Sequence, residues 1–192
     1  MIRRALACAV LSLAAGCATA PVGPVAGDQH AALQQLDDWS LKGRVAIAAG
    51  TEGFSGGIVW RQQGPHAGIE LRGPLGGQAL TIEVDGDRFV VADGEGARLE
   101  GAEAERLVRE RIGAALPMTE MRYWLLGIPA PGLPFRETAA PDGSLQSLEQ
   151  SAWQVQVLRR TTAGSYVLPA RIEMSTTGLR LRLSVTDWQV SP

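Results

Sequence analysis

Hydrophobic and polar residues alternate one by one along much of the chain, which is the pattern of a β-strand with one buried face. The first such segment has Trp39, Leu41, Val45 and Ile47 on its apolar side. Later segments repeat this period, with apolar members Phe54, Ile58 and Trp60; Ile69 and Leu71; Leu80, Ile82 and Val84; Phe89 and Val91; Trp153, Val155 and Val157; Ala170, Ile172 and Met174; and Leu179, Leu181, Leu183 and Val185. Turns such as Asp85-Gly86 separate them, so the pattern predicts short antiparallel strands.

Three segments have helical spacing instead. Asp28 is a plausible N-cap for a short helix that has Leu33 and Leu36 on one edge. Residues 103–113 and 119–126 have apolar residues three and four apart, and Gly127 is placed to end the last helix. The sequence thus predicts a mainly β domain with about three helices.

A sheet with one apolar face needs a cover. Eight or more strands and three short helices cannot easily cover that face in full, so the sheet must curl on itself or leave a hollow under the helices. A fully packed sandwich or barrel core shows the same alternation, and periodicity alone favours the packed core. Both interpretations remain open on the residue pattern.

The N-terminus has the layout of a secretory signal, with Arg3 and Arg4 before an apolar stretch over residues 5–15. That stretch is too short to span a bilayer, which takes about 20 residues. Residues 13–17, Leu-Ala-Ala-Gly-Cys, resemble a lipobox, although Ala14 occupies the usual leucine position. We therefore expect residues 1–16 to be a cleaved signal, Cys17 to carry lipid, residues 17–27 to form a tether, and residues 28–192 to form one domain.

The competing interpretation of the N-terminus is ordinary cleavage after Ala20 at an A-x-A site. Cys17 is the only cysteine left after signal removal, which fits its use as a lipid anchor rather than in a disulfide. By resemblance to sorting rules in enteric bacteria, Ala18 after the cysteine favours the outer membrane. We expect attachment through Cys17 at its periplasmic face.

Candidate chemistry is sparse. Residues 53–57 match the G-x-S-x-G elbow around Ser55, with His66 as a conceivable base, but the following residues continue as strand where a hydrolase needs a helix. The glycines fit a strand bend or bulge better. Two histidines and one mature cysteine make no metal cluster. The net charge of −2 gives no reason to expect nucleic acid. No enzyme activity, metal or cofactor is predicted.

Several short motifs nevertheless occur in a distinctive order. They are Trp39-Ser40-Leu41-Lys42-Gly43-Arg44-Val45, Gly73-Pro74-Leu75-Gly76, Tyr123-Trp124-Leu125-Leu126-Gly127-Ile128-Pro129-Ala130-Pro131, Trp153-Gln154-Val155, Leu168-Pro169 and Asp187-Trp188. In this order and spacing, over residues 39–190 and behind a lipobox, the chain resembles the LolB family of outer-membrane lipoprotein receptors.

The resemblance implies a strongly curved, open antiparallel sheet, a half-barrel, capped by helices over a hydrophobic cavity. It implies that the protein accepts triacylated lipoproteins from the periplasmic carrier LolA and inserts them among outer-membrane phospholipids. We expect a monomer. The alternatives are a structural or assembly lipoprotein that acts through a protein interface, and a hydrolase that uses Ser55.

Site residues follow from combining the alternation with the resemblance. The predicted acyl-chain cavity consists of Val45, Ile47, Ile58, Trp60, Ile69, Leu71, Leu80, Ile82, Trp124, Leu125, Ile172, Met174, Leu181 and Leu183. Family members carry a leucine in a protruding loop, which implies that Leu75, between Pro74 and Gly76, enters the membrane. A one-residue register slip would exchange the faces of any strand, so the prediction applies to the face as a whole.

Overall fold

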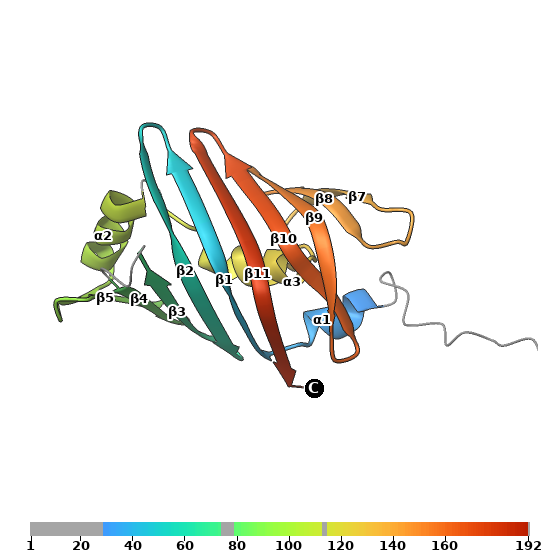
Figure 1. Cartoon of the computed structure of the whole chain (residues 1–192), viewed down its shortest axis with the longest axis horizontal. Helices are drawn as coiled ribbons and strands as arrows, with labels where there is room; N and C mark the ends of the chain where they lie inside the picture. Colours follow the sequence, from blue (N-terminus) through green and yellow to red (C-terminus); the bar gives the residue numbers. More distant parts are fainter. Residues whose placement is uncertain (1–28, 74–78, 113–114, 192) are drawn as a thin grey trace, which may run out of the picture.

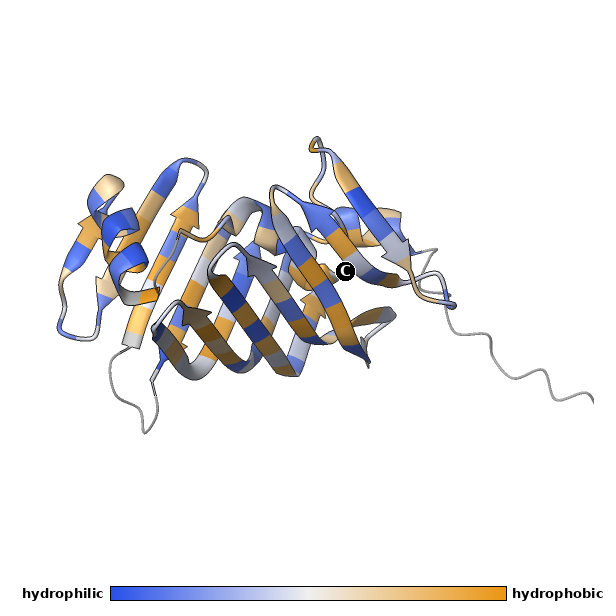
Figure 2. Ribbon diagram, turned by 90° about the horizontal axis from the view of Figure 1, so that it is seen from above, coloured by the Kyte–Doolittle hydropathy of each residue, from blue (hydrophilic) through white to orange (hydrophobic). Residues whose placement is uncertain are grey.

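One antiparallel sheet organises the protein in the computed structural model, which describes residues 29–73, 79–112 and 115–191. Its strands are β1 (Asp38–Ala49), β2 (Glu52–Gln63), β3 (His66–Arg72), β4 (Ala79–Asp85), β5 (Arg88–Asp93), β6 (Arg98–Glu100), β7 (Phe135–Ala139), β8 (Leu145–Gln150), β9 (Trp153–Ala163), β10 (Tyr166–Thr176) and β11 (Leu179–Ser191). Within the described residues it has eleven strands, and the predicted curved, open antiparallel sheet is confirmed (Figures 1 and 2).

The spatial order of the strands is β6-β5-β4-β3-β2-β1-β11-β10-β9-β8-β7. The chain therefore makes two meanders, β1 to β6 and β7 to β11, which meet where the first strand pairs with the last. Each meander consists of hairpins between sequence neighbours, which is the simplest antiparallel connection. The central pairing of β1 with β11 joins the two halves into one sheet.

Three helices cover one face of this sheet, which we call the inner face. They are α1 (His30–Gln34), α2 (Ala102–Ile112) and α3 (Met118–Leu126). Helices α2 and α3 lie in the one long connection, from β6 to β7; α2 packs on β5 and β6, and α3 packs on β10 (Figure 1). No helix in the described ranges is long and apolar enough to cross a bilayer.

Most predicted elements are confirmed. The structure contains every strand expected from alternation and all three helices, and Gly127 ends α3 in the left-handed conformation at φ 79°. Helix α1 begins at His30, and Asp28 lies outside the described residues. Three strands were not predicted: β6, β7 and β8.

Of the bend or bulge predicted for the glycines of residues 53–57, the bulge is absent between β1 and β2. Strands β1 and β2 stay in register through this segment without a shift. A Cβ on Gly56 would collide with the main-chain oxygen of Arg72 on β3. Glycine is therefore needed for a close approach of two backbones. The register shift of this region lies instead between β1 and β11, at Lys42 and Gly43.

Candidate functional site

The inner face of the sheet is a continuous apolar surface. Thirteen of the fourteen residues predicted for the cavity are at most 8% exposed: Val45, Ile47, Ile58, Trp60, Ile69, Leu71, Ile82, Trp124, Leu125, Ile172, Met174, Leu181 and Leu183. Leu80 is partly buried and packs against them. Alternation therefore assigned the buried face of each strand correctly.

Cross-strand pairing aligns these side chains in rows. Ile82 on β4 pairs with Ile69 on β3, which pairs with Trp60 on β2. Val45 on β1 pairs with Leu183 on β11, which pairs with Ile172 on β10. Directly paired side chains on one face of a sheet are in contact distance. The result is an unbroken hydrocarbon surface that spans both meanders.

All five tryptophans of the chain belong to this core. The ring of Trp39 lies 6.0 Å from that of Trp60 and 5.5 Å from that of Trp188, measured between centroids. The indole of Trp60 donates a hydrogen bond to Gln62 Oε1 at 3.0 Å. The indole nitrogen of Trp39 is buried and has no partner among the described residues.

The C-terminal end of helix α3 is attached to β8 through Gln150, which is 3% exposed. Its side-chain oxygen accepts hydrogen bonds from the Trp124 indole at 2.9 Å and from the Ala130 main-chain nitrogen at 2.8 Å. Its side-chain nitrogen donates to the Ala130 oxygen at 2.8 Å. One buried amide thus satisfies both the helix and the segment that follows it.

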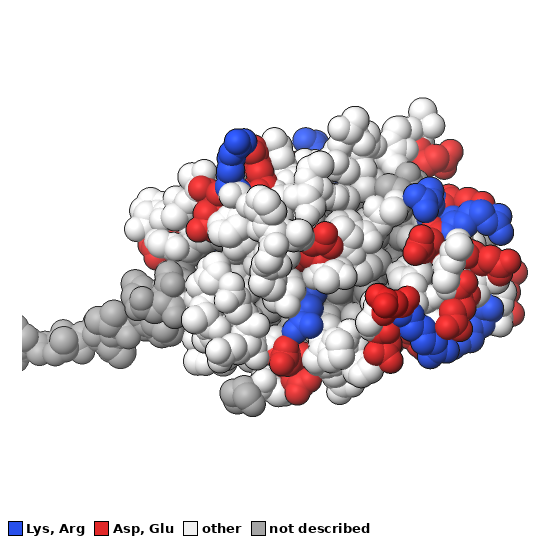
Figure 3. Space-filling view, turned by 180° about the vertical axis from the view of Figure 1, so that it is seen from behind, with Lys and Arg blue, Asp and Glu red and all other residues white. Residues whose placement is uncertain are grey.

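The middle of α3 is attached to the opposite meander through Arg122. Its guanidinium donates to the Gly64 oxygen in the β2–β3 turn at 2.9 Å and to the Asp37 carboxylate at 2.5 Å. The Arg122 side chain is 16% exposed, the Asp37 side chain 62%, and the buried Nε of Arg122 has no partner among the described residues. Helix α3 therefore bridges the two halves of the sheet over the apolar face. Seen from this side, charged side chains gather most densely at one end of the molecule (Figure 3).

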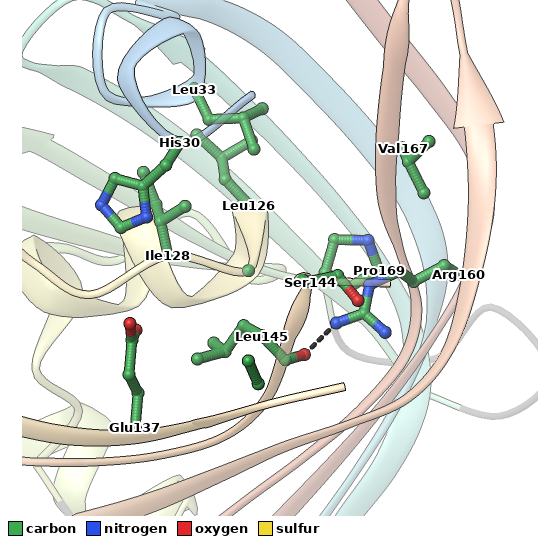
Figure 4. Close-up of a pocket in the computed structure, with 13 residues that line it drawn as sticks. His30, Leu33, Leu126, Ile128, Glu137, Ser144, Leu145, Arg160, Val167 and Pro169 are labelled. Atoms are coloured by element: carbon green, nitrogen blue, oxygen red, sulfur yellow. Dashed lines mark hydrogen bonds between the residues drawn. The ribbon is translucent and has the colours of Figure 1, made fainter. Parts of the chain in front are cut away.

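A small cavity of about 160 Å³ opens where α1, the end of α3 and β7–β10 meet (Figure 4). Leu33, Leu126 and Leu145 contribute apolar walls, and these three also belong to the core. Arg160 reaches the cavity from β9 and donates a hydrogen bond to the Leu145 oxygen. Burial lowers the pKa of the Arg160 guanidinium, and the nearby Asp142 carboxylate opposes that shift.

Two wider hollows lie elsewhere on the described surface. One of about 440 Å³ lies beside β7 and the β8–β9 turn, and one of about 620 Å³ lies between β9 and the second half of β11. None of the fourteen predicted residues lines these two hollows or the smaller cavity. Their side chains are packed against one another and against the helices.

Sequence comparison shows to which family the chain with this packed inner face belongs. The sequence profile described as "LolB: Outer membrane lipoprotein LolB" matches residues 37–188. The chain belongs to the LolB family. It is 35% identical over 164 residues to the outer-membrane lipoprotein LolB of Nitrosococcus oceani, covering 85% of this chain and 82% of that protein. With LolB of Ectopseudomonas mendocina it shares 32% identity over 199 residues, covering 98% and 97%.

A solved structure shows that the fold is shared more widely than the LolB sequences. A LolA superfamily protein from Nitrosomonas europaea has a TM-score of 0.55 to this chain at 10% identity, covering 88% of this chain and 95% of that one. This chain and that LolA superfamily protein therefore share a fold.

The hydrolase alternative has no support in this LolB-family fold. Ser55 is exposed within strand β2, and no helix follows it. His66 pairs with Gln63, eight residues farther along β2, which is about 26 Å from Ser55 at the rise of a strand. His66 instead contacts Asp85 at 2.9 Å. Among the described residues, no three His, Cys, Asp or Glu side chains gather to hold a metal.

Two parts of the predicted LolB-like site lie outside the described residues. They are the lipidation site Cys17, with the signal and tether around it, and the loop Pro74-Leu75-Gly76. Sequence reasoning also missed Arg122 and Gln150, which position α3. Each is a single polar residue with no motif, so only the tertiary fold reveals its partners.

Proposed function

We propose that this LolB-family protein accepts acylated lipoproteins from the periplasmic carrier LolA and inserts them into the outer membrane. The observation that carries the proposal is the continuous apolar inner face, covered by a helix that few polar contacts hold in place. Each methylene exposed to water costs about 0.8 kcal/mol, so three acyl chains would cost tens of kcal/mol in free solution. A protein that relays them must offer an apolar surface.

Acyl chains enter by displacing α3 in this proposal, because the inner-face side chains are packed in the described state. The helix buries Met121, Trp124, Leu125 and Leu126 against the sheet. Hydrocarbon from an acyl chain can replace hydrocarbon from these side chains at similar free energy per area. The net cost of opening is then confined mainly to the polar contacts of Arg122 and to local rearrangement.

Attachment to the outer membrane, at its periplasmic face, is assigned to acyl chains on Cys17. Membrane entry during release is assigned to Leu75, with Pro74 and Gly76 shaping its loop. Burying a leucine in hydrocarbon contributes roughly 1.5 to 3 kcal/mol, whereas a charge there opposes entry. The partners are therefore LolA, triacylated cargo and membrane phospholipid.

Displacement of a bound fluorescent fatty acid by purified triacylated lipoprotein tests the shared acyl site. We expect cargo to release the probe in proportion to cargo binding, whereas cargo without acyl chains leaves it bound. Simultaneous binding of both ligands would contradict a shared site. Absence of any probe binding would favour a structural lipoprotein that acts through a protein interface.

Leu75→Glu tests the release step separately. We expect this variant to take cargo from the carrier normally and to deliver it to liposomes at least about tenfold more slowly, because the lost leucine insertion is worth more than 1.4 kcal/mol. Leu75→Met is the matched control and should deliver normally. Normal delivery by Leu75→Glu would remove Leu75 from the mechanism, and failure of uptake would place the loop in docking instead.

A further inference from the structure

The outer face of the sheet, opposite the helices, carries arginines that are mostly neutralised by carboxylates. Arg61 and Arg72 both contact Glu70, at 2.7 and 3.0 Å, and these hydrogen bonds lower the pKa of Glu70. Arg180 and Arg182 both contact Glu173, at 3.0 and 2.9 Å. In both clusters one carboxylate holds two guanidinium groups.

One row of arginines on this face differs from these clusters because it has no carboxylate partner in the described part of the chain. Arg44 on β1 pairs with Ser184 on β11, Ser184 pairs with Arg171 on β10, and Arg171 pairs with Arg159 on β9. All three arginines are exposed. Among the described residues none of them has an ion-pair partner. We call Arg44, Arg171 and Arg159 the arginine row.

The arginine row is unfavourable for the sheet by itself. Like charges placed directly opposite on neighbouring strands destabilise the pairing, and Arg171 faces Arg159 in this way. Glu173 follows Arg171 by two residues on the same face, but both of its oxygens are engaged by Arg180 and Arg182. Positive charge thus accumulates locally in a chain whose net charge is −2. Such a cluster suits an anionic partner.

The sheet also opens beside the arginine row. Strand β10 pairs with β11 only from Arg171 to Thr176, and its first half stays with β9. The hollow of about 620 Å³ lies at this separation, with Arg159 and Thr161 on one wall and Thr186 and Asp187 on the other. Guanidinium and hydroxyl groups on the β9 wall can donate hydrogen bonds to phosphate oxygens. The Asp187 carboxylate would repel a phosphate from the far wall.

We propose that the arginine row binds the phosphate groups of anionic phospholipids and sets which side of the protein lies against the bilayer. Anionic phospholipid is the partner because its negative charge complements the arginines, and because the proposed acyl anchor on Cys17 keeps the protein at a membrane. The inference rests on that proposed anchor. Eleven residues separate Cys17 from Gln29, a reach of about 40 Å at most, so a lipidated protein is always close to a membrane.

The position of the arginine row agrees with the proposed release loop. Arg72 at the end of β3 pairs with Gly57, and Gly57 pairs with Arg44. The connection that contains Leu75 follows Arg72 directly in the sequence. The arginine row and the end of β3 therefore lie at one level of the sheet, so one orientation brings both to the same membrane surface.

Vesicle binding by a chain without its anchor tests this inference. The mature protein carrying Cys17→Ala is suitable because the whole described core lies within residues 29–191. It is compared on vesicles of phosphatidylcholine alone and of phosphatidylcholine with about one third phosphatidylglycerol, at low salt. The row variant adds Arg159→Ser and Arg171→Ser. The charge-matched control adds Arg106→Ser and Arg109→Ser, which are exposed on α2.

We expect the row variant to lose about 20- to 30-fold in binding to the anionic vesicles, since each arginine near such a surface contributes about a factor of five. The control should lose no more than about twofold. Binding of the protein with an intact arginine row to the anionic vesicles should weaken as the salt concentration rises. The row variant should unfold at the same or a higher urea concentration, because a like-charge pair is removed.

Equal losses in the two variants, or equal binding to neutral and anionic vesicles, would overturn the inference. A row variant that keeps vesicle binding but loses cargo uptake from the carrier would also overturn it, in favour of an acidic protein surface. Because this assay contains no cargo, it is separate from the proposed function. Normal cargo delivery without anionic-lipid binding would reject only the inference, and vesicle binding without delivery would reject only the function.

Discussion

The C-terminal end and the middle of helix α3 are held in different ways. Its C-terminal end is fixed by Gln150, a buried amide that uses both of its polar atoms, and by the left-handed turn at Gly127. Its middle residue, Arg122, makes an ion pair that touches solvent, with one guanidinium nitrogen left without a partner among the described residues. A buried satisfied network is costly to break, whereas an exposed ion pair contributes little. The helix should therefore release its Arg122 contacts first and pivot near Gln150.

The largest effect is expected for Gln150→Leu. This change leaves the Trp124 indole and the Ala130 main-chain nitrogen buried without acceptors. Buried donors without partners cost about 1 to 3 kcal/mol each, so the free energy of unfolding should fall by about 3 kcal/mol. Urea denaturation followed by far-ultraviolet circular dichroism measures it.

Gln62→Leu is the matched control for that change. Gln62 is also a buried amide that binds a tryptophan, Trp60, but it makes two hydrogen bonds, and neither partner belongs to α3. It should cost less than Gln150→Leu and leave the end of α3 in place. If the two variants lost equal stability, Gln150 would not be the principal anchor of the helix.

A smaller effect on stability is expected for Arg122→Met, which keeps the aliphatic length and removes the ion pair. The free energy of unfolding should fall by about 1 kcal/mol or less. If that energy holds the helix closed, affinity for an apolar fluorescent probe should rise up to about fivefold. Equilibrium probe titration measures the affinity.

Asp37→Asn should lower the free energy of unfolding and raise probe affinity by the smallest amounts, because the Asp37 side chain is 62% exposed. We expect a stability change of a few tenths of a kcal/mol and a rise in probe affinity below that of Arg122→Met. Weaker probe binding in both variants would show that the Arg122 contacts form part of the binding surface and do not hold it closed.

The sequence predicted the strands with an alternating apolar pattern and missed those without one. Strands with one buried face, such as β1 and β11, show a period of two that any reader can find. Strand β7 shows none, because all five of its residues are exposed at the edge of the sheet. In β8 the apolar residues Leu145 and Leu148 are three apart, and the next inward position is the polar Gln150. Alternation cannot identify such strands.

The site was predictable only where it is apolar. The inner face follows from alternation, and its proposed use follows from the family resemblance. Arg122 and Gln150 act through partners 58, 85 and 20 residues away, which local patterns do not encode. The arginine row depends on cross-strand register, since Arg44 lies far in sequence from Arg159 and Arg171. Whether the inner face is filled or hollow also depends on the position of α3, which the residue pattern left open.

Tryptophan fluorescence tests the central claim most directly, because all five tryptophans lie in the core that acyl chains are proposed to enter. A fatty acid brominated along its chain quenches an indole that it contacts. We predict that it quenches the tryptophan emission of the folded protein, and that triacylated lipoprotein cargo reverses the quenching. Unchanged emission in the presence of bound brominated fatty acid would contradict the account, since the chain would then bind outside the inner face.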